Sequence, residues 1–430
     1  MRERKESGLP WIGPIPSDWD VVKFKHIFAP CNERNPGDAV VLSLYRELGI
    51  VPKDSRDDNH NVTSLDTSKY RFVRIGDFVV NKMKAWQGST AVSDYEGIVS
   101  PAYYVYEFRD KKTCRKYYHY LLRSKAYAQQ FALLSGGIRE GQWDLPADAL
   151  YNIGIPVPSP MEQSRIATFL DERCAKIDEA IARHDALIKK LDDYRKAVIT
   201  EAVTKGVRGK REMKESGVVW IKEIPSDWTY KPLKAIFTFG KGLSITKANL
   251  VEKGFPVISY GQVHAKYNSG VSVCDELIRY VSKDDICESS LVKKNDLIFA
   301  DTSEDLEGCG NCVYVDTDYP IYGGYHTIVL NSRFEQSNKF IAYLVKTDDW
   351  RFQLRRQLTE VKLYSVSQKV LKDTTVILPP LTEQQEIVAY LDEKCAAIDA
   401  AKERHSQLMA KLEEYKKSLI YYAVTGKIEC

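Results

Sequence analysis

The feature that most constrains this chain is an internal repeat. The segment Glu6–Phe28, ESGLPWIGPIPSDWDVVKFKHIF, is matched by Glu215–Phe237, ESGVVWIKEIPSDWTYKPLKAIF. A second pair, Glu162–Thr204 and Glu383–Thr425, aligns without a gap and is identical at about half of its positions. The stretches between, 29–153 and 238–374, have similar lengths but share little sequence. A unit has therefore been duplicated, which predicts a pseudo-twofold molecule whose two faces are unlike.

The second matched pair has the pattern of two long helices. Prolines precede each segment, so the helices are expected to begin near Met161 and after Pro380. Apolar residues then recur at alternating spacings of four and three, which is the seam of a coiled coil. At 1.5 Å per residue, about 40 residues give a helix of roughly 60 Å. The seam comprises Leu170, Cys174, Ile177, Ile181, His184, Ile188, Leu191 and Val198 in the first helix, and Leu391, Cys395, Ile398, His405, Met409, Leu412 and Leu419 in the second.

Two departures interrupt this seam. The first helix has a gap near Tyr194 and Arg195, and Lys402 stands where the first helix has Ile181. The repeated His184 and His405 are interpreted as packed seam residues, and the repeated cysteines as small apolar fillers. Taken alone, the seam also fits a generic scaffold of two packed helices with no specific function.

Connectivity gives the relative direction of the helices. A short basic linker, 205–211, leads from the first helix into the second module, and that module ends where the second helix begins. The end of one helix and the start of the other must therefore be near each other, which predicts an antiparallel pair. The predicted organisation is a first head at residues 1–160, a helix at 161–205, a second head at 206–380 and a helix at 381–430.

Each head is predicted to mix helices and strands, so the fold class is α+β. Strand-like runs occur at 77–81, 102–108, 296–300 and 327–330, and helical stretches at 116–134 and 339–357. The repeated tryptophans Trp11/Trp220 and Trp19/Trp228 belong to the matched frame. We therefore interpret them as packing anchors of each head.

Loops in the diverged middles combine basic, amide and aromatic side chains, as contacts to phosphates and base edges require. In the first head, one such loop follows a strand and a second precedes the return to the frame. The second head has loops in the same order. The candidate contact residues are Lys82, Lys84, Trp86, Gln87, Arg139 and Gln142 in the first head, and Lys241, Lys247, Gln262, His264, Ser303, Tyr325, His326, Lys362 and Tyr364 in the second.

Charge and composition limit the alternatives. The chain has 62 basic and 59 acidic residues, a net charge of +3, so attraction to nucleic acid would have to come from local clusters. The nine cysteines are scattered and are read as free thiols. The amino terminus is charged and no window is apolar enough for a membrane helix, so we expect a cytoplasmic protein without membrane contact.

Catalytic signatures are missing from the sequence. There is no GxxxxGK[ST] phosphate loop, and no [DNS]PP[YFW] motif of the kind that amino-methylating enzymes use. The pair Cys309 and Cys312 forms a CxxC, but Cys274 and Cys287 lack the spacing of a second zinc knuckle. No catalytic residues, no metal and no cofactor are therefore expected in this chain.

The matched segments resemble the specificity subunits of type I restriction-modification systems. The resemblance rests on the EQ…LDE…C…ID…RH…L…KL…Y…K pattern that begins at Glu162 and at Glu383, and on the WI…IPSDW openings at Trp11 and Trp220. It covers essentially the whole chain. Because the middles are the parts that vary in this family, no base contact can be transferred residue by residue.

This resemblance implies two target-recognition domains, each reading one half of a split, asymmetric site in double-stranded DNA. The helices would set the spacer between the halves. It also implies two modification subunits that methylate adenine with S-adenosylmethionine, and restriction subunits that cleave DNA with ATP and Mg²⁺. The alternative is a non-enzymatic coiled-coil adaptor whose two heads bind proteins, which the near-neutral charge would suit.

Overall fold

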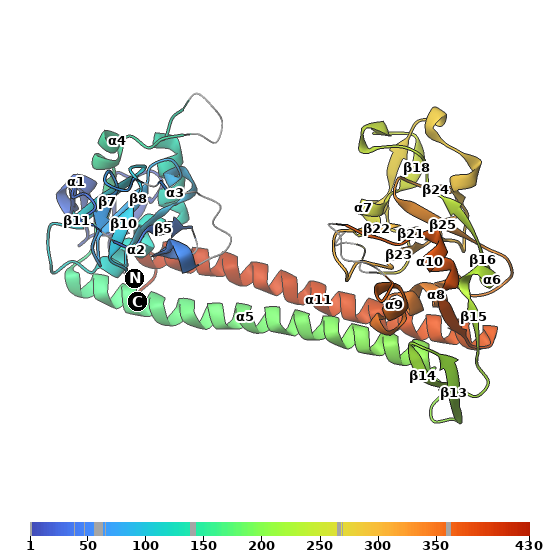
Figure 1. The fold of residues 1–430 in the computed structure, drawn as a ribbon. Helices are drawn as coiled ribbons and strands as arrows, with labels where there is room; N and C mark the ends of the chain where they lie inside the picture. The colour runs from blue at the N-terminus through green and yellow to red at the C-terminus, as the bar shows by residue number, and fades with distance from the viewer. Residues whose placement is uncertain are drawn as a thin grey trace. The chain divides into compact units, whose positions relative to one another are not determined.

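The computed structural model describes residues 2–37, 39–46, 48–55, 63–64, 66–137, 143–264, 268, 270–357 and 363–430. The chain divides into two compact units. Unit 1 contains Met1–Asp185 and Ser406–Cys430, and unit 2 contains Ala186–His405. Each unit thus holds one head together with part of both long helices, α5 (Pro160–Lys205) and α11 (Leu381–Val424) (Figure 1).

A four-stranded antiparallel sheet forms the centre of each head. The strand order is β4-β11-β8-β9 in unit 1 and β16-β25-β21-β23 in unit 2. The strands are β4 (Phe28–Pro30), β8 (Phe78–Asn81), β9 (Thr90–Val92) and β11 (Tyr103–Phe108) in unit 1, and β16 (Phe237–Lys241), β21 (Leu297–Ala300), β23 (Cys312–Tyr314) and β25 (Thr327–Ser332) in unit 2. The diverged middles, 29–153 and 238–374, thus form central sheets of the same strand order although their sequences share little.

The smaller sheets differ between the heads. Unit 1 has the pairs β5–β6 (Leu42–Tyr45, Gly49–Pro52) and β7–β10 (Arg71–Val73, Gly97–Val99). Unit 2 has a five-stranded sheet in the order β17-β19-β18-β24-β20 instead. Its strands are β17 (Leu250–Val251), β18 (Phe255–Ile258), β19 (Arg279–Val281), β20 (Leu291–Val292) and β24 (Ile321–Gly323). The heads therefore share a centre and differ around it.

The repeated frame forms the same two strand pairs in each unit. One is a hairpin, β1–β2 (Arg4–Glu6, Pro14–Pro16) or β13–β14 (Met213–Val218, Ile221–Pro225). The other joins the opening of the head to the strand before the long helix: β3–β12 (Asp20–Lys23, Gly154–Val157) or β15–β27 (Thr229–Pro232, Thr375–Leu378). Short helices follow β3 and β15, namely α1 (Phe24–Ile27) and α6 (Leu233–Ile236).

Each long helical stretch predicted in the heads is two helices. In unit 1, α2 (Arg115–Arg123) and α3 (Lys125–Leu134) are broken at Ser124, which is extended. In unit 2, α8 (Asn338–Val345) and α9 (Asp348–Arg355) are broken before Thr347, whose side chain accepts a hydrogen bond from the backbone NH of Trp350. A Thr side chain stabilises a new helix start in this way, whereas Ser124 makes no capping hydrogen bond. A last short helix precedes the return to the frame, α4 (Ala147–Tyr151) or α10 (Gln368–Asp373).

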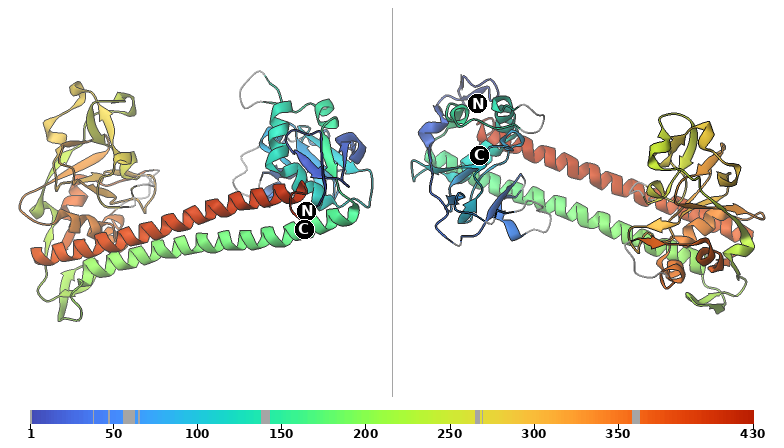
Figure 2. Two further views of the ribbon diagram at one scale, coloured as in Figure 1. Left: turned by 180° about the vertical axis from the view of Figure 1, so that it is seen from behind. Right: turned by 45° about the horizontal axis from the view of Figure 1, so that its top comes forward.

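The helices α5 and α11 run antiparallel within each unit, as predicted, and they lie side by side in both views of Figure 2. In unit 1, Lys416 Nζ lies 2.6 Å from Asp178 Oδ1. In unit 2, Arg195 Nη1 lies 2.5 Å from Asp399 Oδ1, at the positions that match Lys416 and Asp178 in the repeat. At the gap in the first seam, the buried Arg195 of α5 therefore forms an ion pair with Asp399 of α11.

The predicted seam residues are enclosed in their own units. Leu170, Cys174, Ile177, Val198, Leu391, Cys395, Ile398 and Leu419 are buried, and Ile181, His184, Ile188, Leu191, His405, Met409 and Leu412 are half-buried. Six of these eight buried residues join the core of a head. Ile177 and Leu419 pack with Trp19 in unit 1, and Leu391 and Cys395 pack with Trp228 in unit 2.

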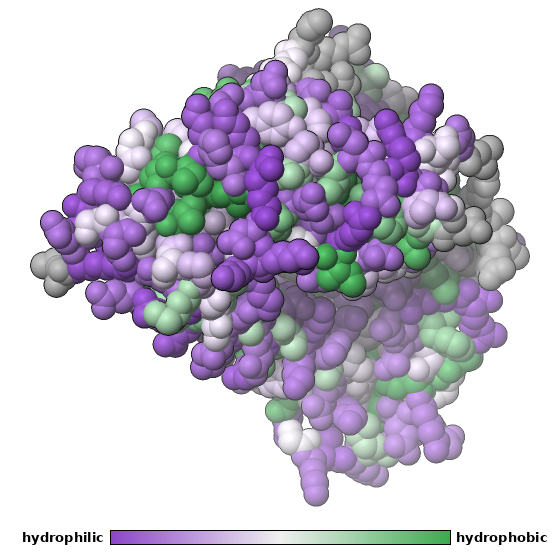
Figure 3. All heavy atoms as spheres, turned by 90° about the vertical axis from the view of Figure 1, so that its left-hand side faces the viewer, coloured by the Kyte–Doolittle hydropathy of each residue, from purple (hydrophilic) through white to green (hydrophobic). Residues whose placement is uncertain are grey.

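The repeated tryptophans behave as packing anchors. Trp19 and Trp228 are fully buried, Trp220 is nearly so, and Trp11 is half-buried against the same core as Trp19. The face of unit 1 in Figure 3 is mostly hydrophilic, with hydrophobic residues in small separate groups. No helix in the described part of the chain combines the length and apolarity needed to cross a bilayer.

Candidate nucleic-acid interface

The same two loops meet in both heads. One follows the central strand β8 or β21, and the other precedes α4 or α10. In unit 1, the backbone NH of Leu145 donates to the carbonyl of Lys82 at 3.0 Å; in unit 2, the NH of Val366 donates to the carbonyl of Asp301 at 2.8 Å. The predicted loop pairs are therefore brought together at equivalent places on each sheet.

In unit 1, these loops present a cation beside two indoles. Lys82 Nζ lies 3.5 Å from Asp144, and Lys84 is exposed. The rings of Trp86 and Trp143 meet edge to face, with centroids 5.1 Å apart. The indole NH of Trp86 donates to the carbonyl of Met83 at 3.1 Å, so the loop itself fixes the orientation of the half-buried Trp86 ring.

Gln87 extends this surface toward two elements that sequence reasoning did not include. Its Oε1 accepts a hydrogen bond at 3.0 Å from Arg46, which follows β5. Arg46, Trp86 and Gln87 line a pocket of about 310 Å³ together with Lys125 and Gln129 of α3. Nothing in the spacing of Arg46 or Lys125 marks them, because they come from other parts of the chain and meet only through the fold.

In unit 2, aromatic rings cluster beside the paired loops. Tyr260, which begins α7 (Tyr260–Val263), meets Tyr325 and His326 edge to face at centroid distances of 5.6 and 5.3 Å. Tyr364 pairs with Ser303 through the strands β22 (Thr302–Ser303) and β26 (Tyr364–Ser365). Tyr325 and His326 therefore lie beside the strand pair that carries Ser303 and Tyr364.

Three of the predicted contact residues make local hydrogen bonds. Gln262 Oε1 accepts from the backbone NH of Ser259 and caps α7, and the hydroxyl of Ser303 donates to the carbonyl of Asp305 at 2.7 Å. His264 has partners on both ring nitrogens. Nε2 lies 2.8 Å from the Thr302 carbonyl, and Nδ1 lies 2.9 Å from Asn311 Nδ2.

This arrangement fixes the role of His264. A carbonyl only accepts, so Nε2 carries the proton and Nδ1 accepts from the Asn311 amide. The Oδ1 of Asn311 in turn accepts at 2.7 Å from Arg351, which is buried. His264 therefore holds the loops in position, and its ring nitrogens are not available to a base edge.

Other predicted residues lie apart from the cluster or outside the described residues. Lys241 ends the edge strand β16, on the far side of β25 from β21. Lys247 begins a short 3-10 turn, Lys247–Asn249, just before β17. Arg139, Gln142 and Lys362 are outside the described residues.

A cleft of about 1010 Å³ separates the loops of unit 2 from its part of α5. Tyr260, His264 and Ser303 line one side, and Arg195 and Lys196 line the other. Burial lowers the pKa of Lys346, on the cleft wall, to about 8. Because acidic residues of the 303–307 loop and of α9 also line the cleft, its walls carry both signs of charge.

The cysteines of the CxxC pair, Cys309 and Cys312, are buried free thiols, and burial raises the pKa of Cys312 to about 11. Among the described residues, no group of three or more His, Cys, Asp or Glu side chains is placed to hold a metal ion.

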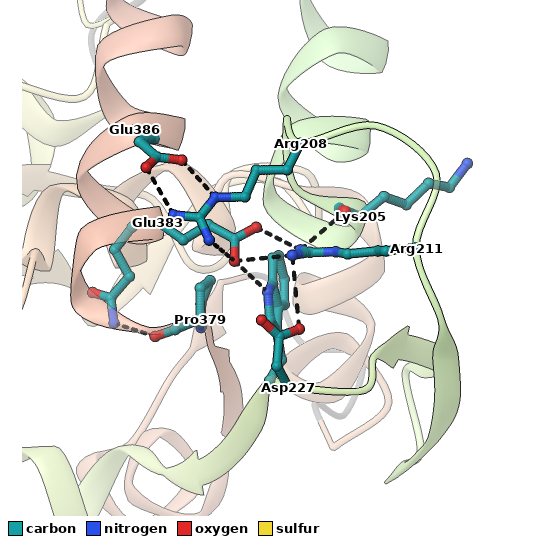
Figure 4. A network of polar contacts seen from close by, with 9 residues as sticks. Lys205, Arg208, Arg211, Asp227, Pro379, Glu383 and Glu386 are labelled. Atoms are coloured by element: carbon teal, nitrogen blue, oxygen red, sulfur yellow. Dashed lines mark hydrogen bonds and ion pairs between the residues drawn. The ribbon is translucent and has the colours of Figure 1, made fainter.

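A buried carboxylate ties each head to its long helix, as Figure 4 shows for unit 2. Glu383 accepts from the indole NH of Trp228 at 3.1 Å and pairs with Arg211 at 2.5 Å. Arg208 pairs with Glu386 through two hydrogen bonds of 2.7 Å. The basic linker is therefore fastened to the start of α11.

Unit 1 repeats this arrangement. Trp19 donates to Glu162 at 3.0 Å, and Arg2 pairs with Glu162 and with Asp18. Sequence reasoning missed the two arginines although a signal was present. The first repeat extends upstream of Glu6, since Arg2-Glu3 and Arg211-Glu212 stand at matched positions.

Comparison with known proteins identifies the family. The family model described as the type I restriction modification DNA specificity domain matches residues 16–187 and 225–410. The chain belongs to this family, which confirms the resemblance seen in the sequence. It is thus a specificity subunit, the non-catalytic DNA-recognition class of protein, and the adaptor alternative is not favoured.

Several relatives match at low identity. The type I restriction enzyme MjaVIII specificity subunit of Methanocaldococcus jannaschii is 23% identical over 96% of this chain and 94% of its own length. The putative MjaX specificity subunit of the same organism is 24% identical over 97% and 95%. The EcoKI specificity subunit of Escherichia coli is 26% identical over 71% and 64%.

Two solved structures share the fold. A chain from a study of complex assembly and conformational transition of the type I R-M system matches with a TM-score of 0.71 and 17% identity, over 96% of this chain and 99% of that one. The HsdS subunit of Thermoanaerobacter tengcongensis matches with a TM-score of 0.54 and 16% identity, over 96% and 98%. Both support the mixed heads and the pair of long helices.

Proposed function

We propose that the two heads of this specificity subunit read the two halves of a split, asymmetric site in double-stranded DNA. The observation that carries the proposal is the repeated meeting of the same two loops on the same sheet, with different side chains in each head. On these loops unit 1 carries Lys82, Trp86 and Trp143, and unit 2 carries Ser303 and Tyr364, beside the rings of Tyr260, Tyr325 and His326. Equivalent loops with unlike chemistry suit two unlike half-sites.

Membership of the family supports a proposal about the partners. The chain would assemble with two modification subunits, which methylate adenine with S-adenosylmethionine, and with restriction subunits, which use ATP and Mg²⁺. In this division of work the specificity subunit binds and orients the DNA, while a modification subunit takes the target base out of the stack. The helices α5 and α11 would set the spacer between half-sites.

Exchange of the diverged middle tests the proposal. Residues 238–374 are replaced by the matching segment of another specificity subunit, and the variant is purified with its modification partner. Sequencing of methylated DNA should show a change in one half of the site and none in the other. A change in both halves, or methylation without sequence preference, would contradict the proposal.

The salt dependence of DNA binding distinguishes a DNA-recognition subunit from an adaptor whose heads bind proteins. If several phosphates are contacted, the affinity for DNA should fall steeply as salt rises, because bound counterions are released on binding. Fluorescence anisotropy with a labelled duplex, between about 50 and 200 mM salt, measures this slope. An adaptor would bind no DNA at any of these concentrations.

A further inference from the structure

One exposed residue of unit 2 has a backbone conformation that L-amino acids seldom adopt. His326 has a φ of 55°, and Asn295 is the other non-glycine residue with positive φ in the described part of the chain. Positive φ is uncommon for any non-glycine residue, although Asn and His adopt it more often than most. The His326 side chain is 58% exposed, so packing in the core does not explain it. Strain of this kind on an exposed side chain points to a function.

The fold holds the His326 ring in a defined place. Its carbonyl accepts from the backbone NH of Asp301 at 3.1 Å, and the ring stands edge to face on Tyr260. The preceding Gly324 packs so closely on Ser259 that a Cβ would lie 2.1 Å from the Ser259 hydroxyl. The turn that carries His326 is therefore fixed against α7.

The neighbours of the ring determine which nitrogen carries the proton. The hydroxyl of Thr302 donates to Asp301 Oδ1 at 2.7 Å, so its oxygen can only accept from the ring. His326 Nδ1 lies 3.4 Å from both the Thr302 hydroxyl and Asp301 Oδ1. Both neighbours are acceptors for Nδ1, which is accordingly the protonated nitrogen of the neutral ring.

The other nitrogen is then an acceptor. Nε2 of His326 has no hydrogen-bond partner within the residues that the structure describes. In the major groove, the groups that donate to such an acceptor are the N6 amino group of adenine and the N4 amino group of cytosine.

We infer that His326 is a specificity-determining residue of unit 2, and that its Nε2 accepts a hydrogen bond from the exocyclic amino group of one base in the half-site. Asp301 and Thr302 are positioning residues that fix the ring tautomer. This inference rests on the proposed function, since it names a base contact within the surface proposed to read DNA.

The experiment combines a protein change with a base change. The complete subunit with its modification partner is compared with the variant His326→Gly on its methylated target sequence. Glycine removes the ring and relieves the positive φ, so the thermal midpoint should be unchanged or higher. At one position of the half-site read by unit 2, the preference for adenine or cytosine should relax, and affinity for the preferred duplex should fall about five- to thirtyfold.

A modified duplex then identifies the bond. Replacing the preferred base by purine or 2-pyrimidinone removes only its amino group, and it should weaken binding by the wild-type subunit to a similar extent. If both changes break one hydrogen bond, the variant should bind the modified and ordinary duplexes equally well. Additive losses would overturn the inference.

A control variant completes the test, and its outcomes distinguish a failure of the His326 inference from a failure of the proposed function. Tyr319 is exposed and precedes β24, whereas His326 follows it, so Tyr319→Ala should leave the base preference unchanged. If the wild-type complex binds its site specifically and His326→Gly keeps the same preference, only the inference about His326 fails. If the wild-type complex shows no sequence preference in either half-site, the proposed function itself fails.

Discussion

The indole nitrogen of Trp228 donates a hydrogen bond of 3.1 Å to the carboxylate of Glu383, whose side chain has no exposed surface. Trp19 and Glu162 make the same contact at 3.0 Å in unit 1. The tryptophan comes from the opening of each repeat and the glutamate from the start of each long helix. The two separately matched segments of sequence therefore meet in the same way in each unit.

Glu383→Ala should lower the free energy of unfolding of unit 2 by about 2–4 kcal/mol. The change leaves the Trp228 indole and Arg211 without their acceptor, and removing one partner of a buried ion pair is strongly destabilising. A loss toward the lower end of this range is expected because the Arg211 side chain is 18% exposed, so water can partly solvate its charge. Denaturant unfolding measures the loss. Glu386→Ala, at an exposed ion pair, is the control and should change little; equal losses in both variants would contradict this account.

Lys402→Ile should leave the free energy of unfolding within about 1 kcal/mol of the wild type, or raise it. Lys402 Nζ lies 2.5 Å from Asp192, and Asp192 is 46% exposed and can be solvated without the lysine. The first repeat already has Ile181 at the matched position, half-buried in the core of unit 1. Denaturant unfolding of both proteins measures the difference. A loss well above this range would mean that the ion pair stabilises unit 2 directly.

The duplicated frame could be predicted from sequence because its signals are local and repeated. Proline placement located both helix starts, and the seam spacing identified the residues that lie between α5 and α11. Individual contact residues could not be predicted in this way. His264 is a loop residue in the sequence, but the fold gives it Thr302 and Asn311 as partners. Arg46 reaches Gln87 only through tertiary structure.

The breaks in the head helices show a second limit of sequence patterns. The sequence predicted a helical stretch over 116–134, which includes Ser124. The structure turns there, since Ser124 is extended. Its side chain is buried and makes no capping hydrogen bond, so the break coincides with tertiary packing of Ser124 and not with a side-chain cap.

Trp86→Ala should weaken DNA binding by about tenfold, which corresponds to about 1.4 kcal/mol, if the unit 1 loops contact DNA as proposed. The ring is half-buried and packs edge to face on Trp143. Loss of the aromatic pair should therefore cost no more than about 1.5 kcal/mol of stability, in addition to the free energy of burying the Trp86 surface. Anisotropy on the methylated target sequence measures the affinity. Trp19→Ala is the contrast, because loss of a fully buried Trp should cost about 3–5 kcal/mol of stability.

Unit 1 should lose stability as the pH falls below about 6.5, and His119 should be one cause. Burial, and then the positive charge of Arg123, lower the pKa of His119 to about 3. The unfolded chain binds a proton on this ring at higher pH than the folded chain does. The stabilisation is therefore complete above the unfolded pKa and is lost as the pH falls from there toward 3.

Replacement of the ring tests this assignment. The slope from one such group is at most about 1.4 kcal/mol per pH unit. In His119→Asn, the side-chain oxygen can still accept from the backbone NH of Val92, as His119 Nδ1 does at 3.3 Å. The variant should show a smaller slope between pH 6.5 and 5, where carboxylates contribute least, in denaturant unfolding of the full chain. An unchanged slope would mean that folding does not lower the pKa of His119.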